Sequence, residues 1–112
     1  MSSSIRLQKP WRALNRAEAE GLPGQLGVYQ LGDHEREIAY IGYAGGHSQF
    51  GVRGEILRWL EDDEAEMKLF RYEVTMQYMT RYKELLMLYV AEHGSLPCAN
   101  PPMGSLGRLT VG

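Results

Sequence analysis

Residues 25–43 carry the feature that most limits the fold, which is a pair of strand-like segments joined by a short polar turn. QLGVYQL and EIAYIGY are rich in β-branched and aromatic residues, as β-strands are. GDHERE, which links them, has the composition of a solvated turn. The sequence therefore predicts a β-hairpin here, so at least part of the sheet is antiparallel.

Neither strand of the hairpin has a purely polar face. Strict alternation places Val28 and Tyr29 on opposite faces of the first strand. The same alternation places Ile38 and Tyr40 together on one face of the second strand. Because both faces carry apolar side chains, we expect other elements to cover the sheet on both sides.

Hydrophobic periodicity predicts helices and one more strand around the hairpin. The predicted elements are a helix over 10–20, a helix over 52–60, a strand over 68–76 and a helix over 78–93 that Gly94 ends. This order defines an α+β domain. We divide the chain into an N-terminal extension with a short helix (1–24), a core domain (25–102) and a C-terminal tail (103–112).

Composition limits the class of protein further. The 112 residues suffice for one domain, and a net charge of −2 is unusual for a stand-alone non-specific nucleic-acid binder. Five of the 14 acidic residues lie in EDDEAE (61–66), which we interpret as a solvated turn; elsewhere 12 basic residues face nine acidic ones. The single cysteine, Cys98, and the lack of a long apolar run predict a cytoplasmic protein that does not enter membranes.

Two helices carry a charged residue in an unusual place. In the helix over 52–60, Arg53 lies beside the apolar stripe, whereas Arg58 lies on the far side near Glu55 and is expected in water. In the helix over 78–93, Glu84 stands alone among small and apolar residues. Arg53 and Glu84 are therefore candidate functional residues.

These residues complete an ordered set of motifs. GVY (27–29) and YIG (40–42) are followed by the inward arginine, the lone glutamate and PCAN (97–100). Over roughly residues 26–101, the set resembles the GIY-YIG nuclease superfamily. The resemblance implies a GIY-YIG-like three-stranded antiparallel sheet flanked by helices. It also implies an endonuclease that hydrolyses phosphodiester bonds with one divalent metal ion, Mg²⁺ or Mn²⁺.

The resemblance assigns the catalytic roles residue by residue. It implies that Tyr29 is the general base or positions the attacking water, and that Tyr40 holds the nucleophile and the phosphate. Arg53 is implied to bind the phosphate and Glu84 the metal ion. A tyrosine titrates near pH ~10, so as a base Tyr29 needs a cation nearby, either Arg53 or the metal. Glu84→Ala is expected to abolish cleavage.

Supporting residues are implied as well. Gly42 matches the glycine that lets the backbone turn beside the site, and Asn100 matches the asparagine that braces it. The chain departs from the pattern at Tyr43, where many relatives have lysine or arginine, and in a longer loop after it. His47 or Ser48 could supply the missing polar group.

Other interpretations stay open. The two motif tyrosines could be ordinary strand residues, Glu84 could form a surface ion pair with Arg81, and Arg53 could pack over Trp59. The domain would then be a catalytically inactive relative that binds nucleic acid or a protein.

The expected partner is nucleic acid, with DNA favoured over RNA. Because no additional DNA-binding domain is attached, a homodimer or a partner protein would supply affinity. An exposed Trp11 on the N-terminal helix could alternatively dock the chain into a larger assembly.

Overall fold

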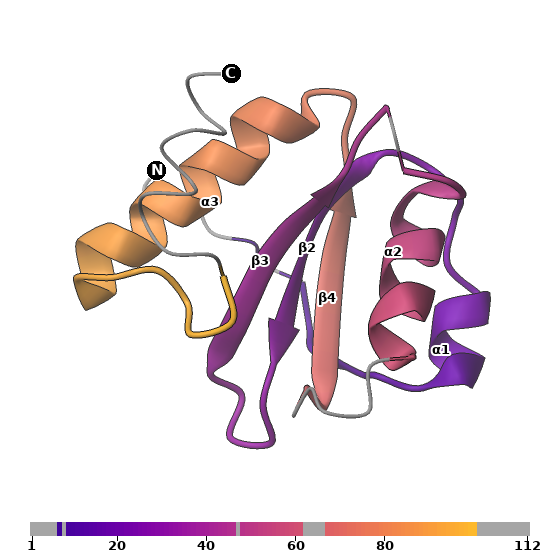
Figure 1. Cartoon of the computed structure of the whole chain (residues 1–112), viewed down its shortest axis with the longest axis horizontal. Coiled ribbons are helices and arrows are strands. Elements are labelled where there is room, and N and C mark those ends of the chain that lie inside the picture. Colours follow the sequence, from indigo (N-terminus) through magenta and orange to yellow (C-terminus); the bar gives the residue numbers. More distant parts are fainter. Residues whose placement is uncertain (1–6, 8, 47, 62–66, 101–112) are drawn as a thin grey trace.

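A computed structural model describes residues 7, 9–46, 48–61 and 67–100. The elements are β1 (Arg12–Ala13), α1 (Arg16–Glu20), β2 (Gly27–Gly32), β3 (Ile38–Ala44), α2 (Gly51–Leu60), β4 (Leu69–Val74) and α3 (Tyr78–His93). They form the predicted α+β domain (Figure 1). None of the helices within the described ranges is long and apolar enough to cross a membrane.

The sheet has four strands in the order β1-β4-β2-β3, and every neighbouring pair is antiparallel. The predicted hairpin is present as β2 and β3. The sheet thus has one strand more than the three that the resemblance implies. The additional strand is β1, whose Arg12 and Ala13 pair with Phe70 and Leu69 of β4.

The predicted helix over 10–20 is wrong in its first half. Arg12 and Ala13 are extended and belong to the sheet. Helix α1 begins only after Asn15, whose side chain accepts a hydrogen bond of 2.8 Å from the backbone N–H of Glu18. An asparagine at this position caps a helix and favours an extended backbone before it, which explains the late start.

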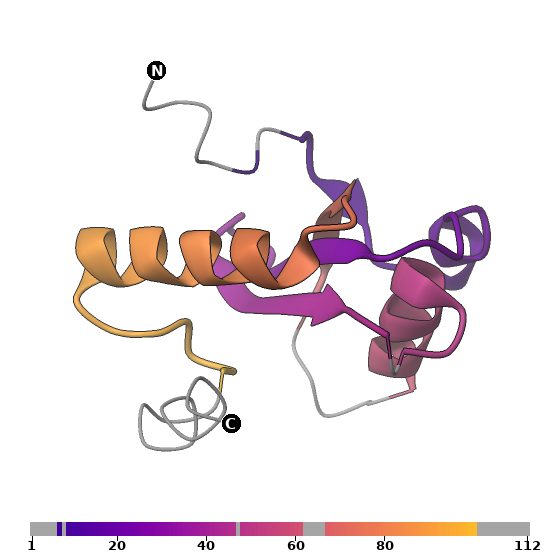
Figure 2. The ribbon, with the colours of Figure 1, turned by 90° about the horizontal axis from the view of Figure 1, so that it is seen from above.

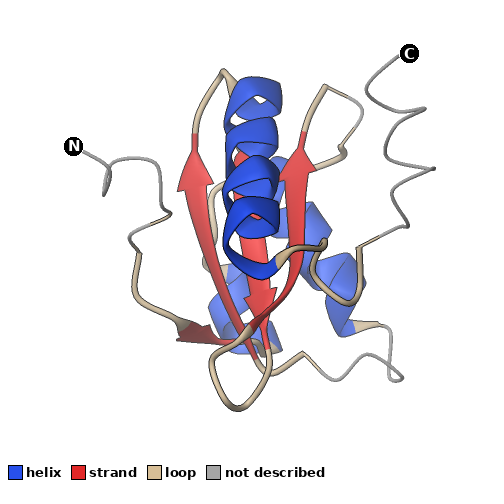
Figure 3. Cartoon of the chain, turned by 90° about the vertical axis from the view of Figure 1, so that its left-hand side faces the viewer, coloured by secondary structure: helices blue, strands red, loops and turns tan. Residues whose placement is uncertain are grey.

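Helices cover both faces of the sheet. Helices α1 and α2 lie together on one face and α3 lies on the other (Figures 1 and 2), and Figure 3 shows α3 in front of the strands. Each face has its own core cluster. The α2 side contains Ala19, Leu22, Tyr29, Leu31, Ala44, Val52, Ile56 and Phe70, and the α3 side contains Leu7, Val28, Ile41, Tyr82, Leu85 and Leu86.

A register shift between β2 and β3 changes which side chains share a face. Leu31 pairs with Tyr40, but the next residue, Gly32, pairs with Ile38, so Ala39 is an extra residue on β3. Tyr40 consequently packs on the α2 side and Ile38 on the α3 side. The prediction that these two side chains share a face is wrong, because a bulge interrupts the alternation.

Two predictions about chain reversals are confirmed. In the exposed turn between β2 and β3, Asp33 Oδ1 accepts backbone hydrogen bonds from Glu35 and Glu37 at 2.9 and 3.0 Å. Helix α3 ends at Gly94, whose φ of 82° lies in the left-handed region that glycine adopts easily. Residues 62–66 and the tail 103–112 lie outside the described residues.

Candidate functional site

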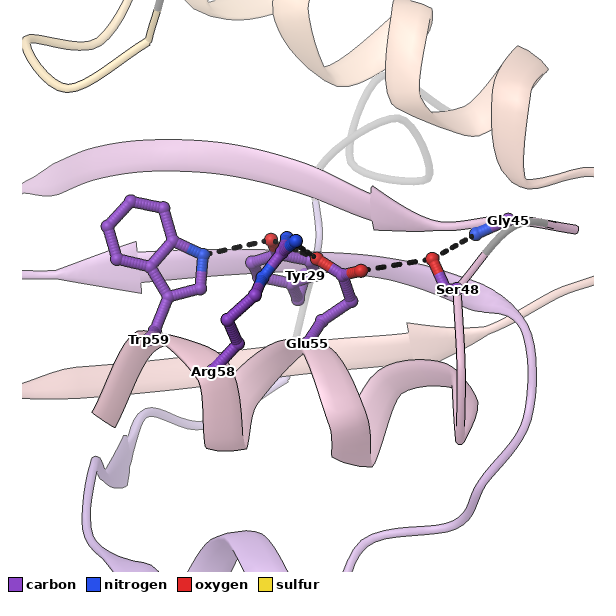
Figure 4. Close-up of polar contacts among 6 residues, drawn as sticks. All are labelled: Tyr29, Gly45, Ser48, Glu55, Arg58 and Trp59. Atoms are coloured by element: carbon purple, nitrogen blue, oxygen red, sulfur yellow. Dashed lines mark hydrogen bonds and ion pairs between the residues drawn. The ribbon is translucent and has the colours of Figure 1, made fainter. Parts of the chain in front are cut away.

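Tyr29 lies in the interior strand β2 with its side chain 1% exposed, and its hydroxyl reaches toward α2. The hydroxyl donates to Glu55 Oε1 at 3.1 Å and accepts from the indole N–H of Trp59 at 3.0 Å (Figure 4). Both partners come from α2, one turn apart. The hydroxyl is therefore fixed by a donor and an acceptor at once.

Glu55 is the centre of this polar network (Figure 4). Its Oε1 also accepts from Arg58 Nη2 at 2.7 Å, and its Oε2 accepts from Ser48 Oγ at 3.0 Å. Ser48 Oγ in turn accepts from the backbone N–H of Gly45 at 3.1 Å. The side chain of Glu55 is only 12% exposed, so its three donors replace most of its contact with water.

The second motif tyrosine joins the first at the sheet surface. The rings of Tyr29 and Tyr40 lie 6.0 Å apart between centroids, and Tyr40 lies 4.7 Å from the ring of Trp59. Gly42 pairs with Tyr29 across β2 and β3. A β-carbon on Gly42 would lie 2.5 Å from Tyr29 Cζ and 2.6 Å from Tyr40 Cε2, so glycine here lets both rings lie over the backbone.

These residues line a pocket of about 480 Å³, which we call the tyrosine pocket. Its mouth is aromatic: Tyr43, exposed by 37%, is stacked on Tyr78 at 5.8 Å and contacts Tyr82 at 4.8 Å. The pocket is lined by Tyr29, Tyr40, Tyr43, Gly45, Gly46, Ser48, Glu55, Arg58, Tyr78, Met79 and Tyr82. It therefore joins side chains from both faces of the sheet around the edge strand β3.

Burial raises the pKa of Tyr29, Tyr40 and Tyr82, three of the tyrosines that line the pocket. Burial, and then the neighbouring Tyr40 and Glu55, raise the pKa of Tyr29 far above its ordinary value. Burial also raises the pKa of Tyr40, and it raises the pKa of Tyr82 to about 12. With its pKa raised, Tyr29 serves as a hydrogen-bond donor to Glu55 at neutral pH. The role of general base that the resemblance implies stays a prediction.

Arg53 and Glu84 do not join the tyrosines. Arg53 lies on α2 beside Gly24, and it does not line the tyrosine pocket. Glu84 is about half exposed and pairs with Arg81 at 3.3 Å, as the alternative interpretation has it. Arg81 also pairs at 3.0 Å with Glu73, a residue of β4.

Glu84 and Tyr29 belong to opposite sides of the sheet. Helix α3, which carries Glu84, packs over one face, whereas the hydroxyl of Tyr29 bonds to α2 on the other. The neighbouring acid is Glu55 instead. The expected set of Tyr29, Arg53 and Glu84 is therefore not assembled in this structure.

The supporting residues have varied positions. Tyr43 lies on the α3 side, where it stacks on Tyr78. Asn100 holds the outer edge of β3, because its Oδ1 accepts from the N–H of Ile41 at 3.0 Å and its Nδ2 donates to the carbonyl of Ile41 at 2.9 Å. His47 lies outside the described residues.

Asn100→Ala is expected to lower the free energy of unfolding by about 1–2 kcal/mol, because two hydrogen bonds to Ile41 are lost. Urea unfolding measures the loss, and amide hydrogen exchange should show faster exchange at Ile41. Ser95→Ala, at an exposed position before this contact, is the control. Unchanged exchange at Ile41 in the Asn100 variant would mean that the side chain does not hold the strand.

The sequence interpretation missed Glu55, Arg58 and Trp59 as site residues. At 100° per residue, Glu55 lies on one flank of the α2 stripe with Arg58 beyond it on the far side, and Arg53 lies on the other flank. The available signal was a carboxylate next to Trp59 on the helical wheel. The sequence could not tell which flank faces the tyrosines.

In this structure Glu84 is not placed to share a divalent cation with the tyrosines. It does not line the tyrosine pocket, and it pairs with Arg81. Within the described ranges, no group of three or more His, Cys, Asp or Glu side chains is placed to hold a metal ion together.

The fold and the site define a small α+β domain with a hydrogen-bonded tyrosine pocket at the edge of its sheet. Residues 5–93 match the model of a family described as a domain of unknown function, DUF7508, and the chain belongs to that family. No curated protein and no solved structure matches the chain. The resemblance to GIY-YIG nucleases stays a prediction.

Proposed function

We propose that this chain is a nucleic-acid-binding domain that keeps the paired tyrosines of the GIY-YIG motif and does not hydrolyse its ligand. The observation that carries the proposal is the position of Glu84. Its carboxylate pairs with Arg81 and does not line the tyrosine pocket, whereas the hydroxyl of Tyr29 in that pocket bonds to Glu55 of α2. Phosphodiester hydrolysis by this motif needs the acid and the tyrosines around one phosphate.

The mouth of the tyrosine pocket suits an unpaired nucleotide. Tyr43 offers an exposed ring already held in place by Tyr78 and Tyr82, and bases stack on such rings without sequence preference. Arg58 lines the same pocket with its side chain 69% exposed, and one of its guanidinium nitrogens, Nη2, donates to Glu55. Its other nitrogens can contact a phosphate.

Tyr43→Ala is expected to weaken binding of single-stranded DNA about 10-fold, because loss of one stacking ring costs about 1–3 kcal/mol. Fluorescence anisotropy with a labelled single-stranded oligonucleotide at fixed salt measures the affinity. Tyr43→Phe keeps the ring and should bind like the parent. Met87→Ala, at a position 72% exposed on α3 that does not line the pocket, is the second control.

Labelled double-stranded DNA and single-stranded RNA belong in the same experiment. We expect single strands to bind more tightly than the duplex, since only an unpaired base can stack on Tyr43. Equal affinity of the parent and Tyr43→Ala for every strand would reject the pocket as the binding site. Absence of saturable binding to any strand would reject the function.

A second candidate is the divalent-metal-dependent endonuclease that the resemblance implies. It is favoured by one specific observation: Tyr29 and Tyr40 do meet over Gly42, and the carboxylate of Glu55 lies on the hydroxyl of Tyr29. In an active enzyme, Glu55 rather than Glu84 would then be the essential acid.

A cleavage panel with Mg²⁺ and Mn²⁺ separates the two candidates. Our proposal expects no cleavage of DNA or RNA by the parent. If cleavage occurs, Glu55→Gln should remove it and Glu84→Gln, at an exposed position on α3, should not. Cleavage that needs Glu84 but tolerates Glu55→Gln would restore the role that the resemblance implies for Glu84.

A further inference from the structure

Arg71 on β4 is a partly buried cation whose contacts among the described residues are with neutral groups. Its Nε donates to the side-chain oxygen of Gln30 at 2.7 Å, and its Nη1 donates to the carbonyl of Lys9 at 3.3 Å. Its guanidinium lies 4.1 Å from the ring of Trp11. Arg71 thus covers one face of Trp11, which is half-buried and lies before β1 and not on a helix.

Four other arginines differ from Arg71 in that each forms an ion pair with a carboxylate. Arg12, Arg16, Arg58 and Arg81 all form ion pairs with glutamates. Within the described ranges, no carboxylate pairs with Arg71. Partial burial lowers the pKa of Arg71 through loss of water.

Arg71 opens onto a hollow of about 540 Å³ between α3, the sheet and the segment around Lys9, which we call the Arg71 hollow. Its wall is apolar where Ile38 of β3 meets Leu85 and Leu88 of α3. Arg71 and Lys9 provide positive charge at the other part of the lining. A pocket of this size and mixed character is typical of a small-molecule site.

We infer that the Arg71 hollow binds a small amphipathic carboxylate, with the head group on Arg71 and the apolar chain against Leu85 and Leu88. A guanidinium has five N–H groups, and the two contacts to Gln30 and Lys9 use two of them, which leaves three. Two parallel N–H groups match the two oxygens of a carboxylate.

The apolar part of the lining narrows the choice of ligand further. Ile38, Leu85 and Leu88 offer no side-chain partner to a second charged group, so the ligand has one carboxylate and an uncharged chain. Glu92, exposed in the last turn of α3, also lines the Arg71 hollow. The site is separate from the tyrosine pocket, with which it shares no lining residue. The inference therefore goes beyond the nucleic-acid function.

Isothermal titration calorimetry with octanoate tests the inference on the full chain. We expect saturable binding to the parent, at least about 10-fold weaker binding to Arg71→Met, and unchanged binding to Arg16→Met, which loses only an exposed ion pair with Glu20. Octan-1-ol has the same chain without the carboxylate and should bind far more weakly than octanoate.

Leu88→Trp provides a second variant that leaves Arg71 in place. The larger side chain should fill the Arg71 hollow and block octanoate, while circular dichroism verifies the fold. No saturable octanoate binding to the parent would overturn the inference. So would equal affinity for octan-1-ol, or octanoate binding that neither Arg71→Met nor Leu88→Trp weakens.

Discussion

Gly42→Ala is expected to lower the free energy of unfolding by about 2–3 kcal/mol and to displace the rings of the tyrosine pocket. The added β-carbon would lie 2.5 Å from Tyr29 Cζ, and Tyr29 is a fully buried core side chain. Overpacking of this kind forces side chains out of favoured rotamers or shifts the backbone. Chemical unfolding followed by tyrosine and tryptophan fluorescence measures both the stability and the environment of Trp59.

Gly46→Ala, in the loop that follows β3 and lines the same pocket, is the matched control. A β-carbon there meets only Tyr78 Oη, at 3.9 Å, so the substitution should change stability by no more than about 0.5 kcal/mol. If both alanine variants are as stable as the parent, the close approach of Tyr29 to Gly42 does not constrain this fold. A loss of stability in Gly42→Ala alone would show that this close approach does constrain the fold.

Alkaline pH is expected to unfold the protein through its buried tyrosines. An unfolded tyrosine titrates near pH ~10, whereas burial raises the pKa of Tyr29 in the folded state. Above about pH 10, Tyr29 loses its proton in the unfolded chain but keeps it in the folded protein. Stability is therefore fully present below about pH 10 and falls by about 1.4 kcal/mol per pH unit above it for this residue. Burial raises the pKa of Tyr82 to about 12, so Tyr82 adds to this loss of stability between about pH 10 and pH 12.

Urea unfolding at a series of pH values from about 8 to 11 measures this slope. Tyr29→Phe should be less stable at neutral pH, because two hydrogen bonds are lost, but its stability should fall less steeply above about pH 10. Trp59→Phe loses one of those bonds and keeps Tyr29, so it should be less stable with an unchanged slope. Identical slopes in all three proteins would show that Tyr29 does not control the alkaline transition.

The sequence predicted the elements best where local signals agree. Helix α3 has a clear apolar stripe and a terminating glycine, and its bounds match the expected 78–93. The hairpin was equally clear from its composition. The predicted N-terminal helix was too long because Ala and Glu favour helix. In the structure Asn15 caps the helix and Arg12 pairs with β4, so the helix begins only at Arg16.

The candidate site was predicted in part, for reasons of geometry. The resemblance to the GIY-YIG motifs singled out Tyr29, Tyr40 and Gly42, which do come together. Whether Arg53 or Glu55 faces them depends on the rotation of α2 against the sheet, and a helical wheel does not contain that rotation. The side of the sheet that α3 covers, and hence the position of Glu84, is likewise a tertiary property.

The hydrogen bonds of Ala99 and Asn100 to β3, which we call the clasp, also affect whether copies of this molecule associate through their sheets. Strand β3 is at the edge of the sheet, and an open edge is a template for pairing with another chain. Ala99 donates its backbone N–H to the carbonyl of Ala39, and Asn100 occupies both backbone groups of Ile41. The clasp lies beyond the matched residues 5–93, so a version cut to the family boundary would expose this edge to self-association.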